Sequence, residues 1–163
     1  MKFRVYTDGS TRGNGQENAV GGWAYAVVND EYNSLVSGTC MAVVGTTNQR
    51  MELTAAIYGL KEVERLLEEG ETATIITDSA YLHNCYTQKW YRNWQKNGWK
   101  NAKKQPVANQ DLWEQLIPYF ESDKYNFEKV KGHANNSTVH EIWNNYVDEL
   151  AQNISAARKE SLL

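Results

Sequence analysis

The spacing of apolar residues changes its period near residue 47, and this change constrains the fold more than any other feature. Residues 2–8, 22–28 and 34–44 read as strands separated by polar, turn-rich segments, with a loop at 9–18. From residue 47 to 69 the apolar residues recur at helical spacing, and Gly70 is suited to ending that helix. The following strand, at 72–78, has no room for a polar face. Such a strand belongs inside a sheet. The order of the expected elements predicts an α/β domain that opens with a three-stranded antiparallel meander.

The second half of the chain continues to alternate helices and strands. Helices are expected at 79–88, 90–97, 109–121 and 141–157, and a last strand at 125–131. The last helix is expected to bury Trp143, Tyr146, Val147, Leu150, Ala151 and Ile154. One domain is therefore expected over residues 1–157, followed by a short tail at 158–163.

Composition limits the class of protein. Of the 163 residues, 41% are hydrophobic and 12% aromatic, which is typical of a globular domain. No stretch approaches about 18 consecutive apolar residues, and the N-terminus lacks the pattern of a signal segment. Cys40 and Cys85 have no zinc-site spacing and read as reduced thiols. These features predict a cytoplasmic protein without a membrane segment, with a monomer as the default.

Basic residues gather in one part of a chain whose net charge is −3. The 32 residues between Asp78 and Asp111 contain no acidic residue, and their cations are Lys89, Arg92, Lys96, Lys100, Lys103 and Lys104. The chain holds 17 basic and 20 acidic residues, so the remainder without these six cations has a charge of −9. The net charge alone argues against a polyanionic partner, but a local basic face is typical of a docking surface for one.

Four acidic residues stand where strands and helices could direct them to one point. Asp8 and Asp78 each close a predicted strand, which places both at the carboxyl edge of the sheet. Glu52 lies in the first turns of the first long helix, and Asp148 lies in the last helix beside the apolar Val147. Each acid also has a simpler interpretation, because such residues suit turns, helix caps or solvated helix positions.

Convergence of the four acids would predict a metal site, because clustered carboxylates repel each other unless cations neutralise them. Oxygen ligands suit Mg²⁺, with Mn²⁺ as a substitute, and exclude softer metals that prefer His and Cys. Two such ions about 4 Å apart can activate water and stabilise a leaving oxygen at a phosphate. The expected chemistry is phosphodiester hydrolysis.

Five motifs resemble those of type 1 ribonucleases H and occur in that family's order. They are Thr7-Asp8-Gly9-Ser10, Thr47-Asn48-Gln49-Arg50-Met51-Glu52-Leu53, Thr77-Asp78-Ser79, Lys131-Gly132-His133-Ala134 and Val147-Asp148-Glu149-Leu150-Ala151. The resemblance implies an RNase H-like fold, with a five-stranded mixed sheet of three antiparallel and two parallel strands, flanking helices and a basic protrusion. It also implies an endoribonuclease that hydrolyses the RNA strand of RNA–DNA hybrids with Mg²⁺ and leaves 5′-phosphate and 3′-hydroxyl ends.

The same resemblance assigns the site residues. Asp8, Glu52, Asp78 and Asp148 would hold the metal ions, two of them when substrate is bound. His133 would move protons or assist product release, a role suited to a group that titrates near neutral pH. The interval between His133 and Asp148 is longer than the family pattern, so His140 is an alternative for this role.

Contacts with nucleic acid are implied as well. The residues expected to contact the DNA strand are Tyr81, Trp90, Thr47 and Asn109. Those expected to contact the RNA strand near its 2′-hydroxyls are Asn14, Asn48 and Gln49. The protrusion would be formed by Lys96, Trp99, Lys100, Lys103 and Lys104. Rings can pack on sugars while ammonium groups pair with phosphates. Trp94 and Trp113 are expected in the core. Gly45 stands where many members have an arginine of the DNA-phosphate pocket, so that pocket is expected to be weaker here.

Two other functions compete with this one. A transposase-like or integrase-like DNA nuclease shares the metal chemistry on a related fold, but such chains generally carry extra DNA-binding regions and lack this protrusion. A non-catalytic hybrid-binding module would hold nucleic acid without cutting it. The presence of all four acids argues against that module.

Overall fold

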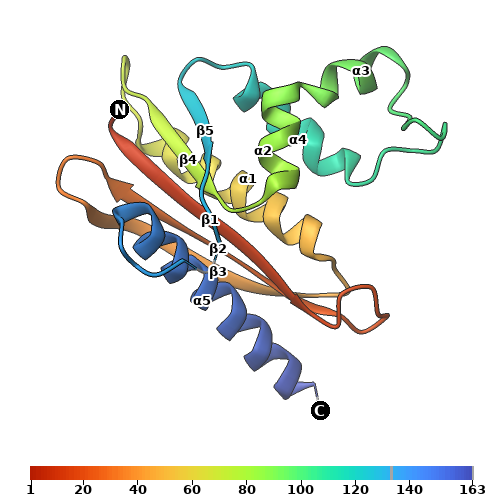
Figure 1. The fold of residues 1–163 in the computed structure, drawn as a ribbon, viewed down its shortest axis with the longest axis horizontal. Coiled ribbons are helices and arrows are strands. Elements are labelled where there is room, and N and C mark those ends of the chain that lie inside the picture. Colours follow the sequence, from red (N-terminus) through yellow and green to blue (C-terminus); the bar gives the residue numbers. More distant parts are fainter. Residues whose placement is uncertain (133, 163) are drawn as a thin grey trace.

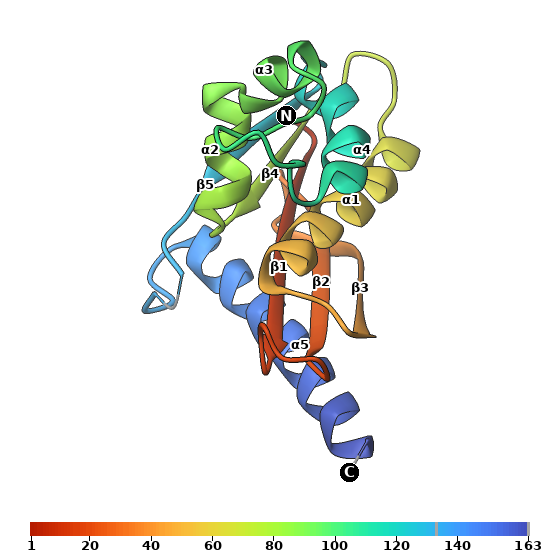
Figure 2. The same ribbon diagram turned by 90° about the vertical axis from the view of Figure 1, so that its right-hand side faces the viewer.

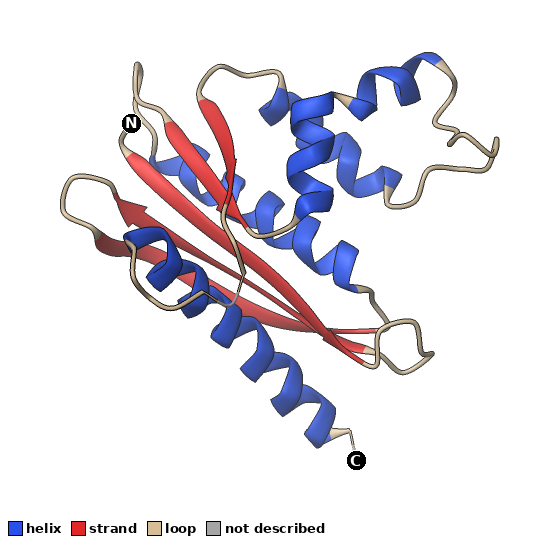
Figure 3. Cartoon of the chain, in the orientation of Figure 1, coloured by secondary structure: helices blue, strands red, loops and turns tan. Residues whose placement is uncertain are grey.

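The computed structural model describes residues 1–132 and 134–162, and its elements follow the order expected from the sequence. The strands are β1 (Phe3–Arg12), β2 (Val20–Asn29), β3 (Ser34–Val44), β4 (Ala73–Thr77) and β5 (Tyr125–Lys129). The helices are α1 (Asn48–Leu66), α2 (Ala80–Gln88), α3 (Trp90–Lys96), α4 (Gln110–Phe120) and α5 (Val139–Ser161). Figure 3 shows these strands in one layer with helices around them.

The five strands form one mixed sheet in the order β3-β2-β1-β4-β5 (Figure 1). β2 pairs antiparallel with both β1 and β3, whereas β4 pairs parallel with both β1 and β5. The predicted sheet of three antiparallel and two parallel strands is therefore confirmed. β4, the strand without a polar face, lies between two neighbours and is buried along its whole length.

Helices cover both faces of the sheet (Figure 2). α5 packs on one face against β1 and β2, while α1 packs on the other face and contacts α4 and α2. Side chains of β1 alternate between the two layers, as strand geometry requires. Phe3 and Val5 belong to the core under α1, and Tyr6 belongs to the core under α5.

The first loop is shorter than the sequence predicted. The prediction placed a loop at 9–18, but β1 continues to Arg12 and β2 begins at Val20. The reason is antiparallel pairing, which continues to the last pair, Arg12 with Val20. A turn-rich composition gave no sign of this extension, because ladder hydrogen bonds form between segments and not within one.

The last helix is longer than predicted at both ends. It begins at Val139 because Thr138 caps it, with the Glu141 N–H donating to Thr138 Oγ1 at 3.1 Å. It continues to Ser161, so residues 158–161, which were expected to form a tail, extend the helix. Among the residues that the structure describes, no helix has the length and apolarity that crossing a membrane requires.

The predicted buried face of α5 is partly wrong. Val147 and Ala151 are buried as expected, but Tyr146 is 38% exposed. Asn144 and Ser155 are fully buried in its place. The sheet face beneath α5 carries small residues, among them Ala24 and Ala26, so the helix lies close to the strands and its contact line holds slim side chains. Trp143, Leu150 and Ile154 lie at the half-buried flanks.

Candidate metal centre and nucleic-acid interface

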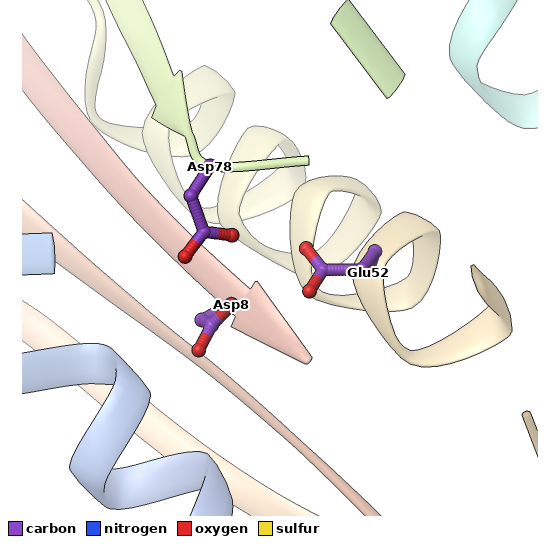
Figure 4. Close-up of side chains that lie close together, drawn as sticks. All are labelled: Asp8, Glu52 and Asp78. Carbon is purple, nitrogen blue, oxygen red and sulfur yellow. The ribbon is translucent and has the colours of Figure 1, made fainter. Parts of the chain in front are cut away.

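Three of the four predicted acids meet at the carboxyl edge of the sheet (Figure 4). Asp8 comes from β1, Asp78 directly follows β4, and Glu52 comes from the first turns of α1. One carboxylate oxygen from each residue lies within 4.8 Å of the other two. The convergence of these three distant acids is therefore present in the fold, while their role as metal ligands stays a prediction.

The start of α1 places Glu52 against β1. The helix begins after Thr47, whose side chain accepts a hydrogen bond from the Arg50 N–H at 3.2 Å. A Cβ on Gly9 would lie 2.4 Å from the backbone nitrogen of Glu52, so this close approach requires glycine. The Gly9 N–H also donates to Glu52 Oε1 at 3.2 Å.

The electrostatics of the cluster favour a bound cation. Burial raises the pKa of Asp8, and the Glu52 and Asp78 carboxylates raise it further. Burial and then the charge of Asp78 also raise the pKa of Glu52. Glu52 Oε2 is buried without a hydrogen-bond donor from the described residues. An all-oxygen donor set with an unsatisfied buried oxygen fits a hard divalent cation, which would neutralise the repulsion.

Asp148 lies at the side of this cluster. A side-chain hydrogen bond with Asp148 contributes to the raised pKa of Asp8, and the charge of Asp148 contributes to that of Glu52. Gln152, one turn further along α5, donates from Nε2 to both Asp148 oxygens at 3.0 Å. The fold therefore brings the fourth predicted acid next to Asp8.

Two residues of the site were not predicted. Asn144 is fully buried, and its Nδ2 donates to Asp78 Oδ2 at 3.3 Å. Gly132 approaches the same carboxylate, since a Cβ there would lie 3.0 Å from Asp78 Oδ2. One sequence signal could have revealed Asn144: it precedes Asp148 by four residues, which places both on one face of a helix.

The two candidate histidines have different outcomes. His133 lies outside the described residues. His140 lies in the first turn of α5, with Nδ1 2.7 Å from the hydroxyl of the buried Tyr6. It lines a cavity of about 400 Å³ with Arg4 and Thr74, which belong to the amino-terminal halves of β1 and β4. That position is on the side away from the strand ends that carry the acids.

A cleft of about 500 Å³ gathers most of the predicted contacts of the two nucleic-acid strands. It is lined by Asn14, Gly15, Thr47, Asn48, Gln49, Ala108 and Asn109. The Asn48 N–H donates to Asn14 Oδ1 at 3.0 Å, which ties the β1–β2 loop to the start of α1. The positive end of a helix dipole attracts anions, so this cleft at the start of α1 suits a phosphate.

Arg50, which sequence reasoning did not assign, organises one wall of this cleft. Its Nη1 donates to Asn109 Oδ1 at 3.2 Å, and its two terminal nitrogens bind Asp111 at 3.1 and 2.9 Å. Asn109 Nδ2 in turn donates to the Tyr81 hydroxyl at 3.3 Å. Arg50 and Gly45 both line a neighbouring cavity of about 440 Å³. The guanidinium of Arg50 is therefore paired with Asp111 and shares a cavity with Gly45, where the family pattern has an arginine.

The basic protrusion is anchored by aromatic rings that pack against one another at tilted angles. The ring of Trp94 lies 6.3 Å from that of Trp90, 5.7 Å from that of Trp99 and 5.8 Å from that of Trp113. Trp113 is fully buried and Trp94 half-buried, in line with their predicted core role. α3 and the loop after it extend away from the sheet (Figure 1), and Lys96, Lys100, Lys103 and Lys104 are exposed there.

The fold and the site together define a class of protein: a mixed α/β domain with an acidic pocket at the carboxyl edge of its sheet and a basic protrusion beside it. The profile of the RNase H family matches residues 1–156. Ribonuclease H of Syntrophomonas wolfei is 42% identical over 149 residues, 91% of this chain and 92% of the relative. Ribonuclease H of Moorella thermoacetica is 41% identical over 159 residues, 97% of this chain and 95% of the relative. The chain belongs to the RNase H family, as its motifs predicted.

Solved structures of related domains share the fold. The PFV RNase H domain has a TM-score of 0.77 at 21% identity, covering 96% of this chain and 95% of that one. LC9-RNase H1, described as a type 1 RNase H with the type 2 active-site motif, has a TM-score of 0.74 at 24% identity, covering 95% and 72%. A foamy viral protease-reverse transcriptase in complex with RNA/DNA hybrid has a TM-score of 0.78 at 19% identity, covering 94% of this chain and 20% of that one.

Proposed function

We propose that this protein is an endoribonuclease that hydrolyses the RNA strand of RNA–DNA hybrids and leaves 5′-phosphate and 3′-hydroxyl ends. The observation that carries the proposal is the meeting of Asp8, Glu52 and Asp78 within 4.8 Å in a chain of the RNase H family. The substrate class is supported by relatives named ribonuclease H and by the hybrid bound to a reverse transcriptase that contains the same fold.

The proposed metal is Mg²⁺, with Mn²⁺ as a substitute and two ions when the hybrid is bound. Asp8, Glu52, Asp78 and Asp148 would hold it, a role supported by their oxygen-only donor set and by the raised pKa of Asp8 and of Glu52. A metal ion held by these residues would supply activation of the attacking water and stabilisation of the leaving oxygen. His133 is proposed to transfer protons during turnover or to assist product release.

The cleft at the start of α1 is proposed to fix the hybrid. Thr47 and Asn109 would bind a DNA phosphate, supported by the helix N-terminus and by the Arg50 contact that orients the Asn109 amide. Asn14, Asn48 and Gln49 would contact the RNA strand near its 2′-hydroxyls, the groups that distinguish RNA from DNA.

The exposed lysines of the protrusion would pair with phosphates along the duplex, and Tyr81 and Trp90 would contact sugars of the DNA strand. We also propose that the protein acts as a monomer in the cytoplasm. The acids of one site all come from one chain, and Cys40 and Cys85 are free thiols.

A cleavage assay with strand-specific labels tests this function. The RNA of a labelled hybrid should be lost with Mg²⁺ and retained with EDTA, while duplex DNA and duplex RNA stay intact. Asp8→Asn should abolish cleavage and leave hybrid binding largely unchanged, because it removes charge from the metal site and not from the docking face. Asp123→Asn, which removes an exposed carboxylate elsewhere, is the matched control. Cleavage of duplex DNA would favour a transposase-like nuclease, and binding without cleavage would favour a non-catalytic module.

A further inference from the structure

We infer that Asn144 is a positioning residue that orients the Asp78 carboxylate for metal binding, an inference that rests on the proposed function. Asn144 lies on α5, has 0% exposure, and donates from Nδ2 to Asp78 Oδ2 at 3.3 Å. In the described part of the chain, this is the one side-chain hydrogen bond that Asn144 makes.

The burial of this amide has no explanation in packing alone. Its neighbours along the inner face of α5, Val147 and Ala151, are apolar and belong to a hydrophobic cluster. Burying an amide in such surroundings costs free energy unless its polar atoms are paired. Asn144 Oδ1 is nevertheless buried without a partner among the described residues. An apolar side chain would pack here at lower cost, so the contact with Asp78 is the feature that asparagine supplies.

The position of Asn144 links two of the acids. It precedes Asp148 by four residues, so one face of α5 presents the amide to Asp78 and the carboxylate to the Asp8 side of the cluster. Gly132 closes on the same oxygen of Asp78, where a Cβ would lie 3.0 Å away. Asn144 and the backbone at residue 132 therefore restrict rotation of the Asp78 carboxylate, which faces Asp8 and Glu52 (Figure 4).

A carboxylate held in one orientation binds a metal ion more tightly, because less side-chain freedom is lost on binding. Removing such a supporting partner typically weakens metal affinity or activity about 10- to 100-fold. Docking of the hybrid should be unaffected, because Asn144 is buried and takes no part in the cleft or the protrusion. The effect should therefore appear in metal affinity and in kcat, with an unchanged KM for the hybrid.

Two variants at this position separate orientation from packing. Asn144→Leu keeps a branched side chain with the same number of heavy atoms and removes the donor, whereas Asn144→Ala removes the branched side chain together with the donor. Ser155→Ala is the matched control, because Ser155 is equally buried on α5 and bonds to the Gln152 carbonyl and to none of the four acids. Titration calorimetry with Mg²⁺ and Mn²⁺ on the free protein measures affinity, and thermal unfolding confirms that each variant is folded.

Both Asn144 variants should bind metal about 10- to 100-fold more weakly, with kcat partly restored by excess metal, while Ser155→Ala keeps wild-type affinity. Should Asn144→Ala fail to fold, Asn144→Leu decides the question. Wild-type affinity and kcat in Asn144→Leu would overturn the inference and leave the proposed function standing, provided that the wild type cleaves hybrids. Equal losses in Ser155→Ala would also overturn it. A wild type that neither binds metal nor cleaves would remove both proposals.

Discussion

The backbone N–H of Gly9 donates to Glu52 Oε1 at 3.2 Å and so joins β1 to the first turns of α1. Asp8 directly precedes Gly9, so the close contact between Gly9 and Glu52 also sets the distance between the Asp8 and Glu52 carboxylates. The contact is possible because residue 9 has no side chain: a Cβ would lie 2.4 Å from the Glu52 nitrogen. The arrangement of the acids therefore depends on the close approach of the β1 and α1 backbones as well as on the carboxylates themselves.

Gly9→Ala should push α1 away from β1 and separate Asp8 from Glu52. Overpacking of this kind typically destabilises a protein by about 1–3 kcal/mol. The rate of hybrid cleavage should fall by more than the loss of folded protein explains. Small misplacements of catalytic groups can lower rates by about 100-fold. Denaturant unfolding and single-turnover cleavage measure the two effects. Wild-type turnover in the folded variant would show that the contact between Gly9 and Glu52 does not determine the arrangement of the acids.

The sequence was sufficient to predict the sheet and the acids, because both leave local signals. β4 has no polar face, and Asp8 and Asp78 each directly follow the last residue pair of the parallel β1–β4 ladder, Thr7 with Thr77, so they lie side by side at the carboxyl edge of that ladder. The exposure of Tyr146 could not be predicted, because it depends on how closely α5 lies on β2. The spacing of apolar residues along a helix does not show how closely that helix approaches the sheet.

The role of Arg50 was also beyond sequence reasoning. It occupies the first turn of α1, where an arginine reads as an ordinary helix residue. Its partners, Asn109 and Asp111, lie about sixty positions further along the chain and reach it because α4 packs against α1. The start of α5 at Thr138 is different, since a Thr with Glu three residues later is a recognisable capping signal that the prediction overlooked.

The metal-free protein should lose stability as the pH rises. Because the pKa of Asp8 and that of Glu52 are raised in the folded state, the folded protein binds more protons than the unfolded chain between the ordinary carboxyl pKa and the raised values. Its free energy of unfolding should therefore fall with increasing pH across that window. Thermal unfolding in EDTA at a series of pH values measures this. A Tm in EDTA that rises with pH across this window would contradict the prediction.

Asp8→Asn should raise the Tm of the metal-free protein at neutral pH, because the raised pKa of Asp8 makes the wild type take up a proton on folding, and an amide does not need one. Mg²⁺ should raise the Tm of the wild type and have a much smaller effect on the variant. Asp123→Asn, at an exposed position, serves as the control and should change neither value. Equal stabilisation of wild type and Asp8→Asn by Mg²⁺ would place the metal elsewhere.

Lys103→Ala combined with Lys104→Ala should weaken hybrid binding and reduce its dependence on salt. Each lost phosphate contact lowers the slope of log K against log salt by about 1. The matched control is Lys2→Ala with Lys124→Ala, two exposed lysines at the amino ends of β1 and β5. Fluorescence anisotropy over a range of salt concentrations gives both slopes. An unchanged slope in the first pair would exclude the protrusion as the docking face.

His133→Ala should slow turnover, whereas His140→Ala should mainly lower stability. His140 bonds to the hydroxyl of the buried Tyr6, which also accepts from Arg4, so loss of this one hydrogen bond should cost about 0.5–1.5 kcal/mol. A double-mutant cycle with Tyr6→Phe measures this coupling alongside kcat for each variant. A larger loss of kcat in His140→Ala than in His133→Ala would transfer the proton role to His140.

The most direct test of the central claim is the position of a bound metal ion. Crystals soaked in Mn²⁺ should give an anomalous scattering peak coordinated by carboxylate oxygens of Asp8, Glu52 and Asp78. The predicted result is a peak that these three residues share and that disappears in Asp8→Asn. A peak bound elsewhere, or none at saturating Mn²⁺ with the three side chains pointing apart, would contradict the account.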